Sequence, residues 1–227
     1  MRLEGRRVEG ELPGRQGRLA FVFLVLVRQR AVTRDELLEA LWPEPPAADA
    51  LSPLLSKLRR AVPLEGRGAV RLALPAGAWV DVEAAGEALH RAEGAVARGD
   101  WAAAWGPARV AQHIAARGFL PGEELPWVEE RRRELEELHL RALEAAGRAS
   151  LGLGGGELDT AERAARALIA RAPYRESGHR LLMEALAGRG NRAESLLVFD
   201  DLRRRLRDDL GSTPSPETQA LHRRLLG

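Results

Sequence analysis

The segment that most restricts the fold is residues 33–60, which reads as two short amphipathic helices separated by a proline-rich turn. Thr33 and Glu36 have the spacing of a capping box, in which each side chain accepts the other residue's backbone N–H. The first helix is expected to bury Leu37, Leu38, Leu41 and Trp42. It must end there because Pro43, Pro45 and Pro46 follow. The segment therefore predicts a helix-turn-helix.

The second helix, expected over residues 49–62 with Asp49 as its N-cap, carries leucines on one face and polar groups on the other. The apolar ridge consists of Leu51, Leu54, Leu55, Leu58, Ala61 and Val62. The opposite face holds Ser52, Ser56, Lys57, Arg59 and Arg60. Such a face suits the major groove of DNA. Cations in a last helical turn also complement the helix dipole, so this helix alone leaves both readings open. Pro53 fits only in the first turn.

A basic hairpin is expected after this helix, over residues 64–74. Glycines flank Arg67, and a short extended run containing Arg71 ends at Pro75. This pattern indicates the wing of a winged helix-turn-helix, whose tip can contact DNA phosphates. Upstream, the apolar run at residues 15–27 is ambiguous between strand and helix. We interpret it as the first helix of the domain, because the leucine ridge of a helix-turn-helix must pack against a third helix.

Charge is unevenly divided along the chain. Residues 1–80 hold 13 Lys and Arg against 9 Asp and Glu, a net charge of +4, and the remaining residues have a net charge of −2. The positive excess coincides with the winged helix, as phosphate binding requires. The chain has no cysteine, which excludes thiol catalysis and disulfides. Without a recognisable signal peptide, it is expected to be cytoplasmic, with no membrane association.

Residues 81–227 read as alanine- and arginine-rich helices joined by short breakers. The expected helices cover residues 81–98, 101–117, 126–151, 157–171, 174–188, 191–209 and 215–226. Their lengths and small-residue positions indicate degenerate tetratricopeptide repeats, with a plain helical bundle as the alternative. The fold class is thus mainly α: a winged helix with small β-hairpins over residues 1–80, followed by a tetratricopeptide-like domain over residues 81–227.

Motifs for catalysis or cofactor binding are missing from the sequence. The glycine run at residues 152–156 lacks the Lys-Ser/Thr of a phosphate loop and predicts a flexible turn. The five histidines have no metal-ligand spacing, and no nucleophile elbow or paired carboxylates occur. Trp101, Trp105 and Trp127 are expected to pack between helices. We therefore expect no enzyme activity, no cofactor and no metal.

Four stretches of the chain resemble a known family: LPGRQGRLAFVFLVL, VTRDELLEALWP, LLSKLRRAV and the late FDDLRRRLRDDLGSTPSPETQALHRRLL. Together they resemble the actinobacterial transcriptional activators of the antibiotic-regulatory (SARP) type. In that family an OmpR-like winged helix precedes a bacterial transcriptional activator domain. The resemblance implies RNA polymerase as a partner and self-association through the helical domain.

Two hypotheses follow from the sequence. In the first, the protein is a sequence-specific regulator that binds double-stranded promoter DNA, with direct repeats as an expected arrangement of its sites. Ser52, Ser56, Lys57 and Arg60 would enter the major groove, beside Arg59. Phosphates would be held by Thr33, Arg34, Arg67 and Arg71. In the second, the protein is a tetratricopeptide-like interaction protein whose winged helix does not read DNA.

Overall fold

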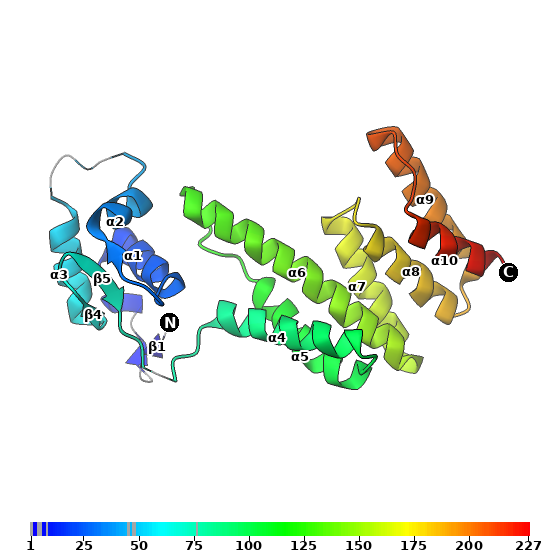
Figure 1. The fold of residues 1–227 in the computed structure, drawn as a ribbon, viewed down its shortest axis with the longest axis horizontal. Coiled ribbons are helices and arrows are strands. Elements are labelled where there is room, and N and C mark those ends of the chain that lie inside the picture. Colours follow the sequence, from blue (N-terminus) through cyan, green and yellow to red (C-terminus); the bar gives the residue numbers. More distant parts are fainter. Residues whose placement is uncertain (1, 4–5, 8, 45, 47–48, 76) are drawn as a thin grey trace. The chain divides into compact units, whose positions relative to one another are not determined.

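The structure is a computed structural model that describes residues 2–3, 6–7, 9–44, 46, 49–75 and 77–227. Its chain divides into two compact units (Figure 1). The first contains Met1–Ala78 and Leu120–Glu130, and the second contains Trp79–Phe119 and Arg131–Gly227. The predicted boundary between residues 80 and 81 is close to the point where the chain first passes from the first unit to the second, between Ala78 and Trp79. The return of Leu120–Glu130 to the first unit was not predicted.

The first unit is a winged helix. Its elements are β1 (Arg2–Leu3), β2 (Arg6–Arg7), the 3-10 helix η1 (Glu9–Glu11), α1 (Gly14–Leu26), β3 (Val32–Thr33), α2 (Arg34–Leu41), α3 (Leu51–Ala61), β4 (Leu64–Glu65) and β5 (Ala69–Leu72). Strands β1 and β2 form a hairpin, and a three-stranded antiparallel sheet has the order β3-β5-β4. The apolar run at residues 15–27 is the helix that we expected.

The helix boundaries follow from local signals. The capping box of α2 is formed: Thr33 Oγ1 accepts the Glu36 N–H at 3.2 Å, and the Glu36 carboxylate accepts the Thr33 N–H at 2.8 Å. The α2 helix ends at Leu41, with Trp42 as its C-cap. Of the proline-rich turn that follows, Pro45 lies outside the described residues. The predicted leucine ridge of α3 is buried against the core of the unit.

A segment from the middle of the chain completes the core of the first unit. Leu125 and Val128 are buried, and the Trp127 indole N–H donates to the Ala40 carbonyl oxygen at 2.8 Å. The Trp127 ring also meets Phe23 of α1 edge-on, with centroids 5.3 Å apart. Our prediction that Trp127 packs between helices holds, but its partners are α1 and α2 of the winged helix.

The second unit contains seven described helices, in the order predicted (Figure 1). They are α4 (Asp81–Ala97), α5 (Trp101–Ala115), α6 (Pro126–Leu153, whose first residues belong to the first unit), α7 (Leu158–Arg171), α8 (Glu176–Gly188), α9 (Arg192–Leu210) and α10 (Pro216–Leu226), with the 3-10 turn η2 (Gly155–Glu157) before α7. Short breakers join the successive pairs α4–α5, α7–α8 and α8–α9, which pack on each other.

Alanine-rich contacts hold these helices close together. One cluster joins α4, α5 and α6 through Ala88, Ala92, Ala108, Ala111, Ala142, Ala145 and Ala146, among others. The glycine run does more than allow a turn: a Cβ on Gly152 would lie 2.2 Å from the Trp101 ring. Trp101 therefore packs against the end of α6 only because residue 152 has no side chain. Gly154 and Gly155, both at positive φ, then form the turn.

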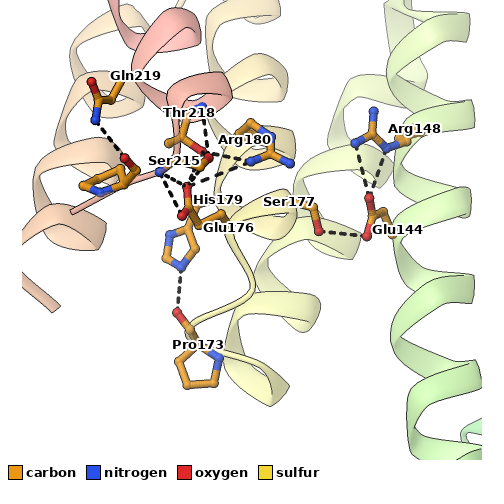
Figure 2. A network of polar contacts seen from close by, with 11 residues as sticks. Glu144, Arg148, Pro173, Glu176, Ser177, His179, Arg180, Ser215, Thr218 and Gln219 are labelled. Atoms are coloured by element: carbon orange, nitrogen blue, oxygen red, sulfur yellow. Dashed lines mark hydrogen bonds and ion pairs between the residues drawn. The ribbon is translucent and has the colours of Figure 1, made fainter. Parts of the chain in front are cut away.

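The most specific element of the resemblance, LGSTPSPET, has a structural role in the second unit (Figure 2). The Glu176 carboxylate, at the start of α8, accepts the Ser215 N–H at 2.9 Å and the Ser215 and Thr218 hydroxyls at 2.8 and 2.5 Å. Ser215 is also the N-cap of α10. Burial raises the pKa of Glu176, but these hydrogen bonds outweigh it and hold the pKa below its ordinary value. The motif therefore ties α10 to α8.

Candidate nucleic-acid interface

The α3 helix begins at Leu51, two residues later than predicted, with Ala50 as its N-cap. Asp49, the predicted N-cap, lies one residue before Ala50, and its carboxylate accepts the Ser52 N–H at 3.1 Å. The hydrogen bonds from Ser52 lower the pKa of Asp49. Pro53 is the third helical residue, where its missing N–H would have had no partner within the helix. Pro53 is therefore compatible with an intact α3.

The exposed face of α3 is cationic. Ser56, Lys57, Arg59 and Arg60 are exposed, and Ser52 is half-buried. Among the described residues, no carboxylate lies within ion-pair distance of Lys57 or Arg60, so neither charge is neutralised by the protein. Directly behind them, Leu55 and Leu58 are buried and fix the rotation of the helix. This face can donate hydrogen bonds to phosphate oxygens or to the acceptor edge of guanine.

An open pocket of about 580 Å³ lies beside this face. It is lined by Arg34, Ser52, Arg59, Leu64, Gly66 and Arg67, from α2, α3 and the wing. Arg34 reaches the Ser52 hydroxyl at 2.6 Å and lies 3.6 Å from the Asp49 carboxylate. Arg59 donates to the Gly66 carbonyl oxygen at the tip of the wing. Three arginines therefore line one concave surface, which is suitable for a phosphate.

The β4–β5 hairpin holds its two arginines differently. Arg71 is opposite Glu65 in the strand register, and the two side chains form an ion pair at 2.7 Å. Arg67 at the tip is exposed and, within the described part of the chain, has no acidic partner. The tip bends at Gly66, whose φ of +83° favours glycine. The wing therefore presents one uncompensated cation.

Seven of the nine predicted site residues fall into two groups. The structure brings Arg34, Ser52, Arg59 and Arg67 around one pocket, while Ser56, Lys57 and Arg60 lie on the open face of α3. Thr33 caps α2, and Arg71 is engaged by Glu65. Sequence reasoning missed Glu65 as the partner of Arg71 and the Gly66 carbonyl oxygen as the acceptor of Arg59. The alternation within residues 64–72 could have indicated the Glu65–Arg71 pair if the hairpin register had been assigned.

Other kinds of site find no support in the described part of the chain. It holds no cluster of three or more His, Asp or Glu side chains that could bind a metal ion. In that part, no helix has the length and apolar character needed to cross a membrane. His139 and His179 are buried. Burial lowers the pKa of both imidazoles.

Known proteins resemble this chain along most of its length. The family model for the bacterial transcriptional activator domain matches residues 80–226. The chain is 36% identical over 220 residues to the regulatory protein AfsR of Streptomyces coelicolor, and 32% identical over 218 residues to the regulatory protein AfsR of Streptomyces griseus. Both alignments cover 93% of this chain but only 22% of the relative, so the chain spans about a fifth of these curated proteins.

A solved structure has the same fold. It is Mycobacterium tuberculosis EmbR in complex with a low affinity phosphopeptide, which matches with a TM-score of 0.81 at 25% sequence identity. The match covers 93% of this chain and 59% of that chain. The winged helix followed by a tetratricopeptide-like helical domain is therefore an arrangement shared with a solved protein.

Proposed function

This chain belongs to the SARP-type bacterial transcriptional activators, and we propose that it regulates transcription by binding promoter DNA through α3 and the wing. The observation that carries the proposal is the uncompensated cationic face of α3 beside a pocket lined by three arginines. Lys57, Arg60 and Ser56 contact base edges in the major groove. Arg34, Arg59 and Arg67 hold backbone phosphates.

The position of Pro53 supports this proposal over a winged helix that does not read DNA. An unbroken α3 with its leucine ridge buried is a rigid element that can enter a groove. The contacts among Asp49, Arg34 and Ser52 also support the proposal, because they fix the start of α3 relative to α2. The polar face of α3 is thus held in one orientation before DNA arrives.

The partners proposed beyond DNA follow from the family. We propose RNA polymerase as the target of activation and direct-repeat sites that place two protomers in the same orientation. Self-association through the helical unit, a cytoplasmic location and the lack of enzyme activity belong to the same proposal.

The experiment is a gel-retardation titration with DNA selected from a random pool by the wild-type protein. We expect K57A/R60A to lower the affinity about 100-fold, because each lost base or phosphate contact costs about 1–3 kcal/mol. Both side chains are exposed, so the melting temperature should hardly change. The matched control is R166A/R171A, which also removes two positive charges. Full retention of specific binding by K57A/R60A would exclude α3 as the reading element.

A further inference from the structure

A second cationic depression lies in the helical unit and shares no residue with the pocket beside α3. It is a groove of about 390 Å³ whose walls are α5 and α7 and whose floor is α6 (Figure 1 shows the three helices). Arg109, Gln112 and His113 line it from α5, and Thr160 and Arg163 from α7. Leu143 and Ala146 of α6 supply an apolar floor. The groove therefore combines hydrogen-bond donors at its rim with an apolar base.

Among the described residues, no carboxylate neutralises the positive charge at the rim of this groove. None of its described lining residues is acidic. Arg109 and Arg163 have no carboxylate within ion-pair distance anywhere in the described chain. The nearest acidic residues of α7 in sequence are engaged elsewhere: Glu162 binds Arg166 and Arg189, and Asp159 binds Arg189 at 2.9 Å. The groove is therefore an electropositive site of the helical unit.

Both guanidinium groups are held in place without an acid. Arg163 donates to the Thr160 hydroxyl at 3.0 Å, one turn earlier on α7. Arg109 lies over the Trp105 ring, with its guanidinium carbon 5.4 Å from the ring centroid. Trp105 is fixed in turn, because its indole N–H donates to Glu157 at 3.3 Å. Since the arginines are already oriented, an anion that binds them loses less free energy in ordering the side chains.

From these features we propose that the groove binds a small organic phosphate with an apolar body. Arg109 and Arg163 contact the phosphate from opposite walls, because two guanidinium groups match its charge and its acceptor oxygens. The apolar body lies on Leu143 and Ala146. The volume is at the lower end of the range for small-molecule sites, which favours a compact ligand over a peptide. Binding bridges α5 to α7 and so stabilises the helical unit.

The test uses the full chain and phenyl phosphate as the probe, measured by isothermal titration calorimetry at low ionic strength. We expect saturable one-to-one binding with a Kd of about 1 mM or tighter, and a rise in melting temperature at saturation. Inorganic phosphate should bind about tenfold more weakly, since it lacks the apolar body, and phenol should not bind measurably. The His113 imidazole resonances should shift on titration, because His113 lines the groove.

Variants decide whether this groove is the site. R109A and R163A should each weaken phenyl phosphate binding about tenfold or more, since each removes a charge-assisted hydrogen bond. Both arginines are exposed, so the variants should fold. The matched control is R91A, which removes an exposed arginine of α4 that does not line the groove. A116W, at the exposed end of α5, should obstruct the groove without changing its charge.

Three results would overturn the proposal. These are no saturable binding of phenyl phosphate, unchanged binding in R109A/R163A, and binding of an oligoglutamate peptide in place of phenyl phosphate. The last result would assign the groove to acidic protein segments. None of them bears on DNA recognition, because the groove and the α3 face share no residue.

Discussion

The two units contain similar numbers of arginines per residue but place them in different ways. On the proposed DNA-binding surface of the first unit, Lys57, Arg60 and Arg67 have no acidic partner among the described residues. In the second unit many arginines are paired across helices, including Arg141–Glu93, Arg171–Glu136 and Arg175–Glu137. Composition alone therefore does not distinguish a nucleic-acid surface from a structural one. What distinguishes them is whether folding brings a carboxylate to each cation.

The largest expected effect tests whether the hydrogen bonds of the Glu176 carboxylate stabilise the second unit. Glu176→Ala would leave the Ser215 N–H and the Thr218 hydroxyl without their acceptor, which should lower the free energy of unfolding by about 3 kcal/mol. Urea denaturation measures this. The control is Glu184→Ala, because its contact with Arg224 is exposed and long, at 3.6 Å. Equal losses for the two variants would show that the network in Figure 2 has no special role.

The next effect concerns the wing of the first unit. A Cβ on Gly66 would lie 2.0 Å from the Ala69 carbonyl oxygen, and its φ is +83°. Gly66→Ala should therefore lower the free energy of unfolding by about 2 kcal/mol and weaken DNA binding by displacing Arg67 and the acceptor of Arg59. Gly68→Ala is the control, since a Cβ there meets nothing within 4 Å. A wing that tolerates Gly66→Ala in both assays would not be a rigid part of the interface.

Acidification should affect the second unit through its buried histidines. Burial lowers the pKa of His139 and His179 below their ordinary value of 6.5, so the unfolded chain binds protons more readily than the folded one. The stability they contribute is complete above pH 6.5 and falls as the pH drops towards the folded-state pKa. Melting temperatures recorded from about pH 7.5 to about pH 5.5 should decline, and less steeply in H139Q/H179Q. Equal slopes would exclude these histidines.

A smaller effect concerns the contribution of one uncompensated cation, Arg67, to DNA binding. Arg67→Ala should reduce the slope of log affinity for DNA against log salt concentration by about 0.9, because one phosphate contact is lost. Binding of different sequences should weaken to a similar extent, since phosphates carry no sequence information. Arg71→Ala should change the slope less, because Glu65 already neutralises Arg71. A larger change for Arg71→Ala would mean that DNA displaces Glu65.

The smallest expected effect concerns the ion-paired arginines of the second unit. Arg166→Ala removes an exposed i,i+4 partner of Glu162 and should cost about 0.5 kcal/mol or less. Because Glu162 keeps its contact with Arg189, no carboxylate is left without a cation. Chemical denaturation beside wild type measures the difference. A loss of several kcal/mol would mean that the paired arginines of this unit are essential to its fold.

The sequence by itself determined the elements. Capping at Thr33, the prolines after Trp42 and the helical spacing of the leucines act over about four residues, so their effects can be read without the fold. The predicted helices of the second unit agree with the structure within a few residues for the same reason. The start of α3 was predicted two residues early, although Pro53 requires a place in the first turn, where no helical hydrogen bond is lost.

Only the tertiary structure decided which charges remain available. Arg34 meets Ser52 across 18 residues of sequence, and Trp127 meets Ala40 across 87. Such contacts depend on the packing of whole helices, which no short sequence window specifies. The same is true of the groove between α5 and α7, where Arg163 has no acidic partner among the described residues because the neighbouring acids turn towards Arg166 and Arg189. The sequence thus supplied the cations, and folding determined which of them can bind a ligand.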